Sequence, residues 1–198
     1  MPTLGSCHRS LNPFKLGVLL KTLIYATKKL LERAKKWETK ALEDGLIRED
    51  GLLAAWYATY AIVEKQHVVV LVNDPTFLTV VIHVKEFKLN PAETMRAAIE
   101  PLLGDMQIDS NRIAKLLSAV ESVRYLPTQN RSMVSRLDRV MLYVTWRIRD
   151  ARSLPRINME MTDELYKDGP AKQERVDDYQ TPRSRLAAEP GLDAGVVP

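Results

Sequence analysis

Apolar, β-branched residues dominate two consecutive runs of the sequence, HVVVLVN at 67–73 and FLTVVIHVK at 77–85. Val, Ile and Thr fit a pleated strand, and the intervening Asp74-Pro75 favours a turn, so the pattern predicts a hairpin. Both runs are almost entirely apolar, which indicates central strands that are covered on at least one face. The alanines of residues 53–63 would accept a helix, but the aromatic and β-branched residues there favour a third strand.

Further elements are predicted on both sides of these strands. Residues 19–26 predict a strand, and Thr27 after it is the expected N-cap of a helix that ends near Gly45. Two more helices are expected to begin at Asn90 and Asp109, because each of these capping residues precedes an apolar repeat of helical period.

The most regular helical pattern begins near Asn130, after a short predicted strand at 123–126. At 100° per residue, its apolar side chains fall in one stripe about 100° wide. The stripe consists of Met133, Leu137, Val140, Met141, Val144 and Ile148. Such a stripe is what a helix packed on a core requires, so this helix should cover the sheet.

Together these elements predict an α+β fold with a mostly antiparallel sheet of four to five strands and three to four packed helices. The expected single domain covers residues 19–152. Residues 1–18 show little periodicity and are interpreted as a flexible leader. Residues 153–198 combine prolines with charged and small residues, so they are predicted to form a disordered tail.

Composition narrows the class of protein. The chain has 198 residues, of which 45% are hydrophobic and 27% charged, as in an ordinary globular protein with one core. Cys7 is the only cysteine and cannot form an internal disulfide, which fits a reducing cytoplasm. The apolar run at 16–26 is interrupted by Lys21 and is shorter than the roughly 20 residues of a membrane span. We therefore expect a cytoplasmic protein without a membrane anchor.

Two groups of cations are candidates for binding an anion. Lys28 and Lys29 lie at the start of the first helix, where positive charge opposes the helix dipole, and they could hold a phosphate or carboxylate. From Arg124 to Arg156 the sequence has eight arginines and no lysine. Arginine grips carboxylate and phosphate groups with its planar fork. The candidates in this stretch are Arg131, Arg136, Arg139 and Arg147. Both groups have a simpler interpretation: the lysines are solvated, and some arginines pair with acidic residues elsewhere.

Metal binding, nucleophilic catalysis and base stacking find less support in the sequence. A type I turn after residue 73 would send His67 and His83 to opposite faces of the hairpin, so we expect no metal site and no cofactor. Ser132 lies outside any nucleophile motif, and no phosphate-binding glycine loop is present in the sequence. Trp56 and Tyr57 could stack on a nucleic-acid base, although a half-buried strand would recruit the same residues for packing.

Three stretches resemble an uncharacterised bacterial family known only as a domain of unknown function. They are IYATKKLL at 24–31, AAWYATYAIVEKQHVVVLVND at 54–74 and TQNRSMVSRLDRV at 128–140. The resemblance spans about residues 22–145 and implies a soluble, cytoplasmic α+β domain of bacteria that starts near residue 22. It brings no established activity. Where that family tends to carry a histidine after the strand tryptophan, this chain has Tyr57.

The sequence leads to a first functional hypothesis and two alternatives. In the first, the chain is a non-catalytic cytoplasmic binding or regulatory module whose candidate cations contact nucleic acid or an acidic protein. In the second, it is an enzyme acting on a small phosphorylated or nucleotide substrate, with Asp74 or Asp138 as a base; this requires a pocket where a carboxylate and the cations converge. In the third, the chain is an interaction protein that binds its partner through the C-terminal tail. No pattern specifies the oligomeric state.

Overall fold

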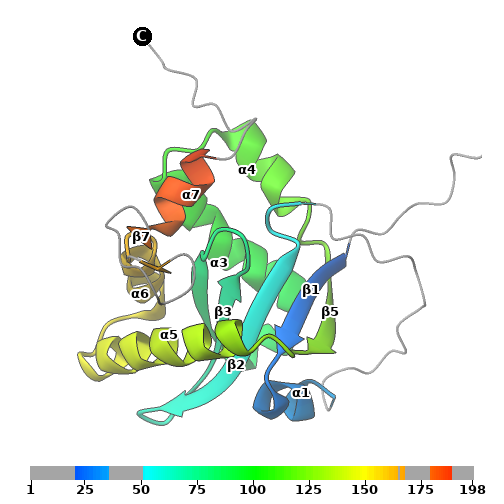
Figure 1. Cartoon of the computed structure of the whole chain (residues 1–198), viewed down its shortest axis with the longest axis vertical. Helices are drawn as coiled ribbons and strands as arrows, with labels where there is room; N and C mark the ends of the chain where they lie inside the picture. The colour runs from blue at the N-terminus through cyan, green and yellow to red at the C-terminus, as the bar shows by residue number, and fades with distance from the viewer. Residues whose placement is uncertain (1–20, 36–50, 165, 168–178, 189–198) are drawn as a thin grey trace, which may run out of the picture.

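The computed structural model describes residues 21–35, 51–164, 166–167 and 179–188, and these form a layered α+β fold around one sheet (Figure 1). The five strands of this sheet follow the order β4-β3-β2-β1-β5. They are β1 (Lys21–Ala26), β2 (Ala55–Val63), β3 (Gln66–Asn73), β4 (Thr79–His83) and β5 (Ser122–Pro127). Strands β2 to β4 form an antiparallel meander, whereas β1 runs parallel to both of its neighbours, β2 and β5.

Helices cover both faces of this sheet. In Figure 1, α5 crosses in front of the sheet and α3 lies behind it. The helices are α1 (Lys28–Ala34), α2 (Val84–Phe87), α3 (Pro91–Asp105), α4 (Ser110–Leu117), α5 (Arg131–Arg149), α6 (Leu154–Met161) and α7 (Pro182–Ala188). A second, two-stranded sheet pairs β6 (Tyr166–Lys167) with β7 (Tyr179–Gln180). The α+β class predicted from the sequence is confirmed.

The apolar strand β3 shows why its sequence lacks alternation. Val68, Val70 and Val72 belong to the core under α5, whereas Val69 and Leu71 belong to the core under α3. All five side chains are fully buried. A strand covered on both faces needs apolar residues at every position, so the sequence correctly indicated a central strand.

The register of the hairpin between β3 and β4 separates the two histidines. His83 pairs with Val68, so its side chain points to the α5 face, as that of Val68 does. His67 precedes Val68 in β3, so its side chain points to the other face. There the Nδ1 atom of His67 lies 2.6 Å from the hydroxyl of Tyr60. The second arm of the hairpin is shorter than predicted, because the chain turns into α2 at Val84.

Three of the predicted helix starts carry the expected cap. The side-chain oxygens of Asn90, Asp109 and Asn130 accept backbone N–H groups at 3.3, 3.1 and 3.2 Å, respectively. Thr27 occupies the N-cap position of α1, but its hydroxyl lies 3.1 Å from that of Thr59 and caps nothing. The predicted apolar stripe of α5 faces the core, with Met141 at its partly buried edge.

The packed part of the chain extends beyond Ser153, where the sequence analysis placed the start of a disordered tail. In α6, Leu154, Ile157 and Met161 are buried against the α5 face. The prolines of the two C-terminal helices lie in their first turns, where proline is tolerated, so these prolines misled the sequence prediction. The predicted leader, the predicted end of the first helix near Gly45 and the remaining tail residues lie outside the described residues.

The buried amide of Asn158 on α6 closes the free edge of β4. Its Oδ1 atom accepts the backbone N–H of Val81 at 2.7 Å, and its Nδ2 atom donates to the Val81 carbonyl at 3.2 Å. One side chain therefore pairs with β4 as a neighbouring strand residue would. Covering an edge in this way prevents pairing with other chains.

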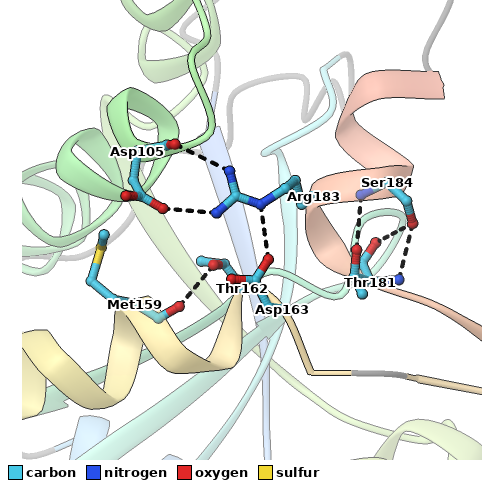
Figure 2. Close-up of polar contacts among 7 residues, drawn as sticks. All are labelled: Asp105, Met159, Thr162, Asp163, Thr181, Arg183 and Ser184. Carbon is cyan, nitrogen blue, oxygen red and sulfur yellow. Dashed lines mark hydrogen bonds and ion pairs between the residues drawn. The ribbon is translucent and has the colours of Figure 1, made fainter.

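Helix α7 is fastened to α3 and α6 by Arg183, as Figure 2 shows. The Arg183 guanidinium donates to carboxylate oxygens of Asp105 and Asp163, each at 2.8 Å, and to the Asp105 carbonyl at 3.1 Å. Hydrogen bonds and charge from the two aspartates raise the pKa of Arg183. Thr181 and Ser184 exchange hydrogen bonds at the start of the helix, in the manner of a capping box.

Candidate functional site

Strands β1 and β5 end side by side, and the helices that follow them leave toward opposite faces of the sheet. Ala26 pairs with Pro127, and the N–H of Thr128 donates to the Ala26 carbonyl at 3.1 Å. Helix α1 then packs on the α3 face through Leu30, whereas α5 packs on the other face through Met133. In open α/β sheets, ligands usually bind beside the carboxyl ends of parallel strands whose helices diverge in this way.

The first residues of both helices bring positive charge to this shared edge. Lys28 and Lys29 begin α1, Arg131 begins α5, and all three side chains are exposed. Neither helix has an acidic residue in its first turn. The nearest acid of α1 is the exposed Glu32, one turn later. Figure 1 shows the two helix starts at the same end of the sheet. We call the surface formed by Lys28, Lys29 and Arg131 the cationic edge.

Three threonines lie close to the ends of β1 and β5. The hydroxyls of Thr27 and Thr59 lie 3.1 Å apart, next to the end of β1. The buried hydroxyl of Thr128, which follows β5, finds no hydrogen-bond partner in the described part of the chain. The exposed ammonium and guanidinium groups donate charge-assisted hydrogen bonds, so this edge is chemically suited to an anion.

The other three predicted cations lie away from this edge. Arg131 and Arg147 are about 24 Å apart along α5 at 1.5 Å per residue. The Arg136 guanidinium lies over the Phe77 ring, 3.5 Å from its centroid, and Arg139 is exposed on the outer side of the helix. The structure therefore brings together only Lys28, Lys29 and Arg131 of the six predicted residues.

Arg147 belongs to a cluster of ion pairs with α6. Its Nη2 donates to Glu164 at 2.8 Å, and its Nε lies 2.9 Å from a Glu160 oxygen. Arg152 and Arg156 also donate to Glu160. Burial raises the pKa of the Glu160 carboxyl, but these arginine hydrogen bonds and charges outweigh burial and hold the pKa below its usual value. In this cluster, the arginines pair with acids of the chain itself.

The predicted stacking residues are part of the core. Trp56 is fully buried and donates its indole N–H to the Leu53 carbonyl at 2.7 Å. Tyr57 is 8% exposed and stacks on Tyr25, with ring centroids 5.1 Å apart. Both aromatic side chains therefore serve packing in this structure and offer almost no surface to an external base.

A groove of about 700 Å³, which no sequence pattern predicted, lies between β4, α3 and α6. Its apolar walls include Ala97, Pro101 and Leu154, and its polar lining includes His83 and Glu86. A groove of this size and character can hold a small apolar group. Sequence reasoning missed it because one wall is α6, which lies in the predicted tail.

A comparison with protein families identifies the chain. The family described as "Domain of unknown function (DUF6933)" matches residues 23–184. The chain belongs to this family. The match begins in β1 and ends within α7, so the family includes the C-terminal helices as well as the sheet. No curated protein and no solved structure matches the chain. None of the helices in the described ranges is long and apolar enough to cross a membrane.

Proposed function

We propose that the chain is a non-catalytic binding or regulatory module of the bacterial cytoplasm that holds an anionic partner, nucleic acid or an acidic protein, at its cationic edge. The observation that carries this proposal is the divergence of α1 and α5 from adjacent strand ends. It presents Lys28, Lys29 and Arg131 on one edge, without an acidic residue in the first turn of either helix. The cytoplasmic location is supported by the lone Cys7.

The charges at this edge are suited to a polyanion that is bound through its backbone. Each cation that neutralises a phosphate releases a counterion, so the logarithm of the binding constant falls with the logarithm of salt concentration. Three such contacts correspond to a slope of about −2 to −3.

The test compares two charge reversals of equal size. The triple variant K28E/K29E/R131E changes the cationic edge, and K85E/K88E/R96E changes three exposed cations of the α2–α3 region by the same total charge. Binding to fluorescent DNA, RNA and a polyglutamate peptide is measured by anisotropy over a salt series. We expect the first variant to lose at least tenfold in affinity, with a flatter salt slope, and the control to lose much less.

Equal losses in the two triple variants would show that net charge alone drives binding and would contradict the proposal. So would undiminished binding of all three probes to K28E/K29E/R131E. The relative affinities for DNA, RNA and polyglutamate identify the class of anion.

The enzyme hypothesis has less support, because its proposed base and the cations do not share a described cavity. Asp138 is exposed on the outer side of α5, and Asp74 lies in the turn between β3 and β4. The groove of about 700 Å³ is lined by neither carboxylate and by none of the cationic-edge residues. The proposal therefore assigns no catalytic residue.

A further inference from the structure

The outer side of α5 carries a patch of large apolar side chains. Leu142, Tyr143 and Trp146 are 51%, 40% and 50% exposed, respectively. The Tyr143 and Trp146 rings meet edge to face with their centroids 6.0 Å apart. In Figure 1, α5 is the frontmost element of the described structure, and no other described element covers it. Single exposed apolar residues are common, but three within five positions of one helix form a patch suited to a partner.

Four charged residues frame this patch with a regular pattern. At 100° per residue, Leu142 and Trp146 lie on either side of the line opposite the buried stripe. Asp138 and Arg149 flank them on one side, and Arg139 and Asp150 flank them on the other. On α5 itself, each flank thus carries one acid and one base, at opposite ends of a segment about 18 Å long. Arg149 also forms an exposed ion pair with Glu64, at 3.2 Å, through its Nε atom.

This pattern is complementary to itself. Consider a second copy of α5 that is antiparallel to the first, related by a two-fold axis near residue 144. Such an axis sets each flank against the same flank of the other helix. Asp138 then faces Arg149 of the partner subunit, and Arg139 faces Asp150 of the partner subunit. Because each contact occurs twice, the arrangement forms four ion pairs around a centre where Leu142 meets Trp146 of the partner subunit.

We propose that the outer face of α5 binds the same face of a second copy of this chain, with the two helices antiparallel. A parallel pair would also bring acids opposite bases, but it would set Asp138 against Arg139 of the partner subunit. It would also align the two helix dipoles, which disfavours it. The antiparallel pair opposes the dipoles and places the smaller Leu142 against the larger Trp146. One helix pair buries less than a standard interface, so the dimer is weak and depends on concentration.

The first experiment measures the mass of the full-length chain by sedimentation equilibrium over a wide concentration range. We expect a monomer–dimer equilibrium, and we expect W146A to raise the dissociation constant at least tenfold, because Trp at the centre of an interface is a typical hot spot. The matched control is L89A, which removes an apolar side chain that is 77% exposed outside the patch. The control should leave the dissociation constant unchanged, and circular dichroism should show both variants folded.

The second experiment tests the orientation by charge reversal. R139E and D150K each set like charges against each other in the antiparallel dimer, so each should raise the dissociation constant about tenfold. The double variant R139E/D150K restores both contacts and should return the constant to near that of the wild type. In a parallel dimer, this double variant would stay impaired, and D138K/R139E would be the pair that restores binding.

Three results would overturn the proposal. The first is a full-length chain that stays monomeric at all concentrations. The second is a dimer that W146A does not weaken. The third is rescue by D138K/R139E in place of R139E/D150K, which would establish the parallel arrangement.

Discussion

The cationic edge and the C-terminal helices use the same kinds of side chain for different purposes. At the cationic edge, Lys28, Lys29 and Arg131 are exposed, and the first turns of their helices contain no acid. Around α6 and α7, by contrast, arginines are joined to carboxylates of the same chain, as Arg183 is to Asp105 and Asp163. The number of arginines in a segment therefore says little about binding. What matters is whether the fold brings an acid to each of them.

Among these variants, the largest loss of stability is expected from Asn158→Ala, in the C-terminal helix α6. It leaves the backbone N–H and C=O of Val81 without the contacts that Asn158 supplies. We expect a loss of about 2–3 kcal/mol in the free energy of unfolding, because unsatisfied buried polar groups cost about 1–3 kcal/mol each. Urea denaturation measures the loss, and light scattering should show added aggregation through the opened β4 edge.

Asn111→Ala is the matched control for this change, because Asn111 is exposed on α4 and loses the same amide group. Its stability should stay within about 0.5 kcal/mol of the wild type. If Asn158→Ala lowered the free energy of unfolding as little as the control does, the Asn158 contacts would not be what covers the edge of β4.

Arg183→Ala should have a smaller effect, confined to the attachment of α7. The substitution removes the contacts to Asp105 and Asp163, but the Arg183 side chain is 37% exposed, so solvent screens them. We expect a loss of about 1 kcal/mol and faster proteolytic cleavage near α7. Arg96→Ala, at an exposed position of α3, serves as the control. Cleavage at the same rate in both variants would show that Arg183 does not fasten α7.

The pH dependence of stability should reveal the arginine cluster around Glu160. The pKa of this carboxyl is below its usual value in the folded chain, so its contribution is present above the unfolded pKa and is lost as pH falls through the folded one. The free-energy difference between wild type and E160Q should be less than about 1 kcal/mol at neutral pH and should vanish well below pH 4.5. A difference that persisted unchanged in acid would mean that charge is not its cause.

The smallest change in stability is expected at the cationic edge. The variant K28E/K29E/R131E should unfold within about 0.5 kcal/mol of the wild type, because exposed side chains contribute little to folding. Acidic residues also suit the first turn of a helix better than basic ones. Thermal and urea denaturation measure this. A large destabilisation would show that these cations hold the fold together, which would remove the contrast with the C-terminal helices.

The sequence predicted the elements whose signals are local. Strand β3 was recognised from its continuous run of β-branched apolar residues, and helix α5 from apolar residues that recur at the helical period. Helices α6 and α7 were missed because their prolines suggested a disordered tail and because the contacts that anchor them are distant in the sequence. Asn158 reaches Val81, 77 residues away, and Arg183 reaches Asp105, 78 residues away. A local sequence pattern cannot predict partners so far away in the chain.

The candidate site also contains residues whose role could be predicted from the sequence and residues whose role could not. Lys28 was predicted from its position at a helix start and Arg131 from the arginine-rich stretch, and the pairing of β1 with β5 places the starts of both helices at one edge. Arg147 belonged to the same prediction, yet Glu160 and Glu164 occupy its guanidinium. Their approach depends on the turn between α5 and α6, where Ala151 has a positive φ of 57°. Sequence periodicity does not encode that turn.

The position of β1 between β2 and β5 has a consequence for synthesis of the chain on the ribosome. Lys21 of β1 pairs with Ser122 of β5, and Thr22 donates to the Ala119 carbonyl, so one edge of β1 must await segments made about 100 residues later. At roughly 5–20 residues per second, that delay lasts about 5–20 s. The meander of β2 to β4 can form meanwhile from local contacts. A chain stalled before residue 122 would expose a bare strand edge, and nascent neighbours on the same messenger could add to it.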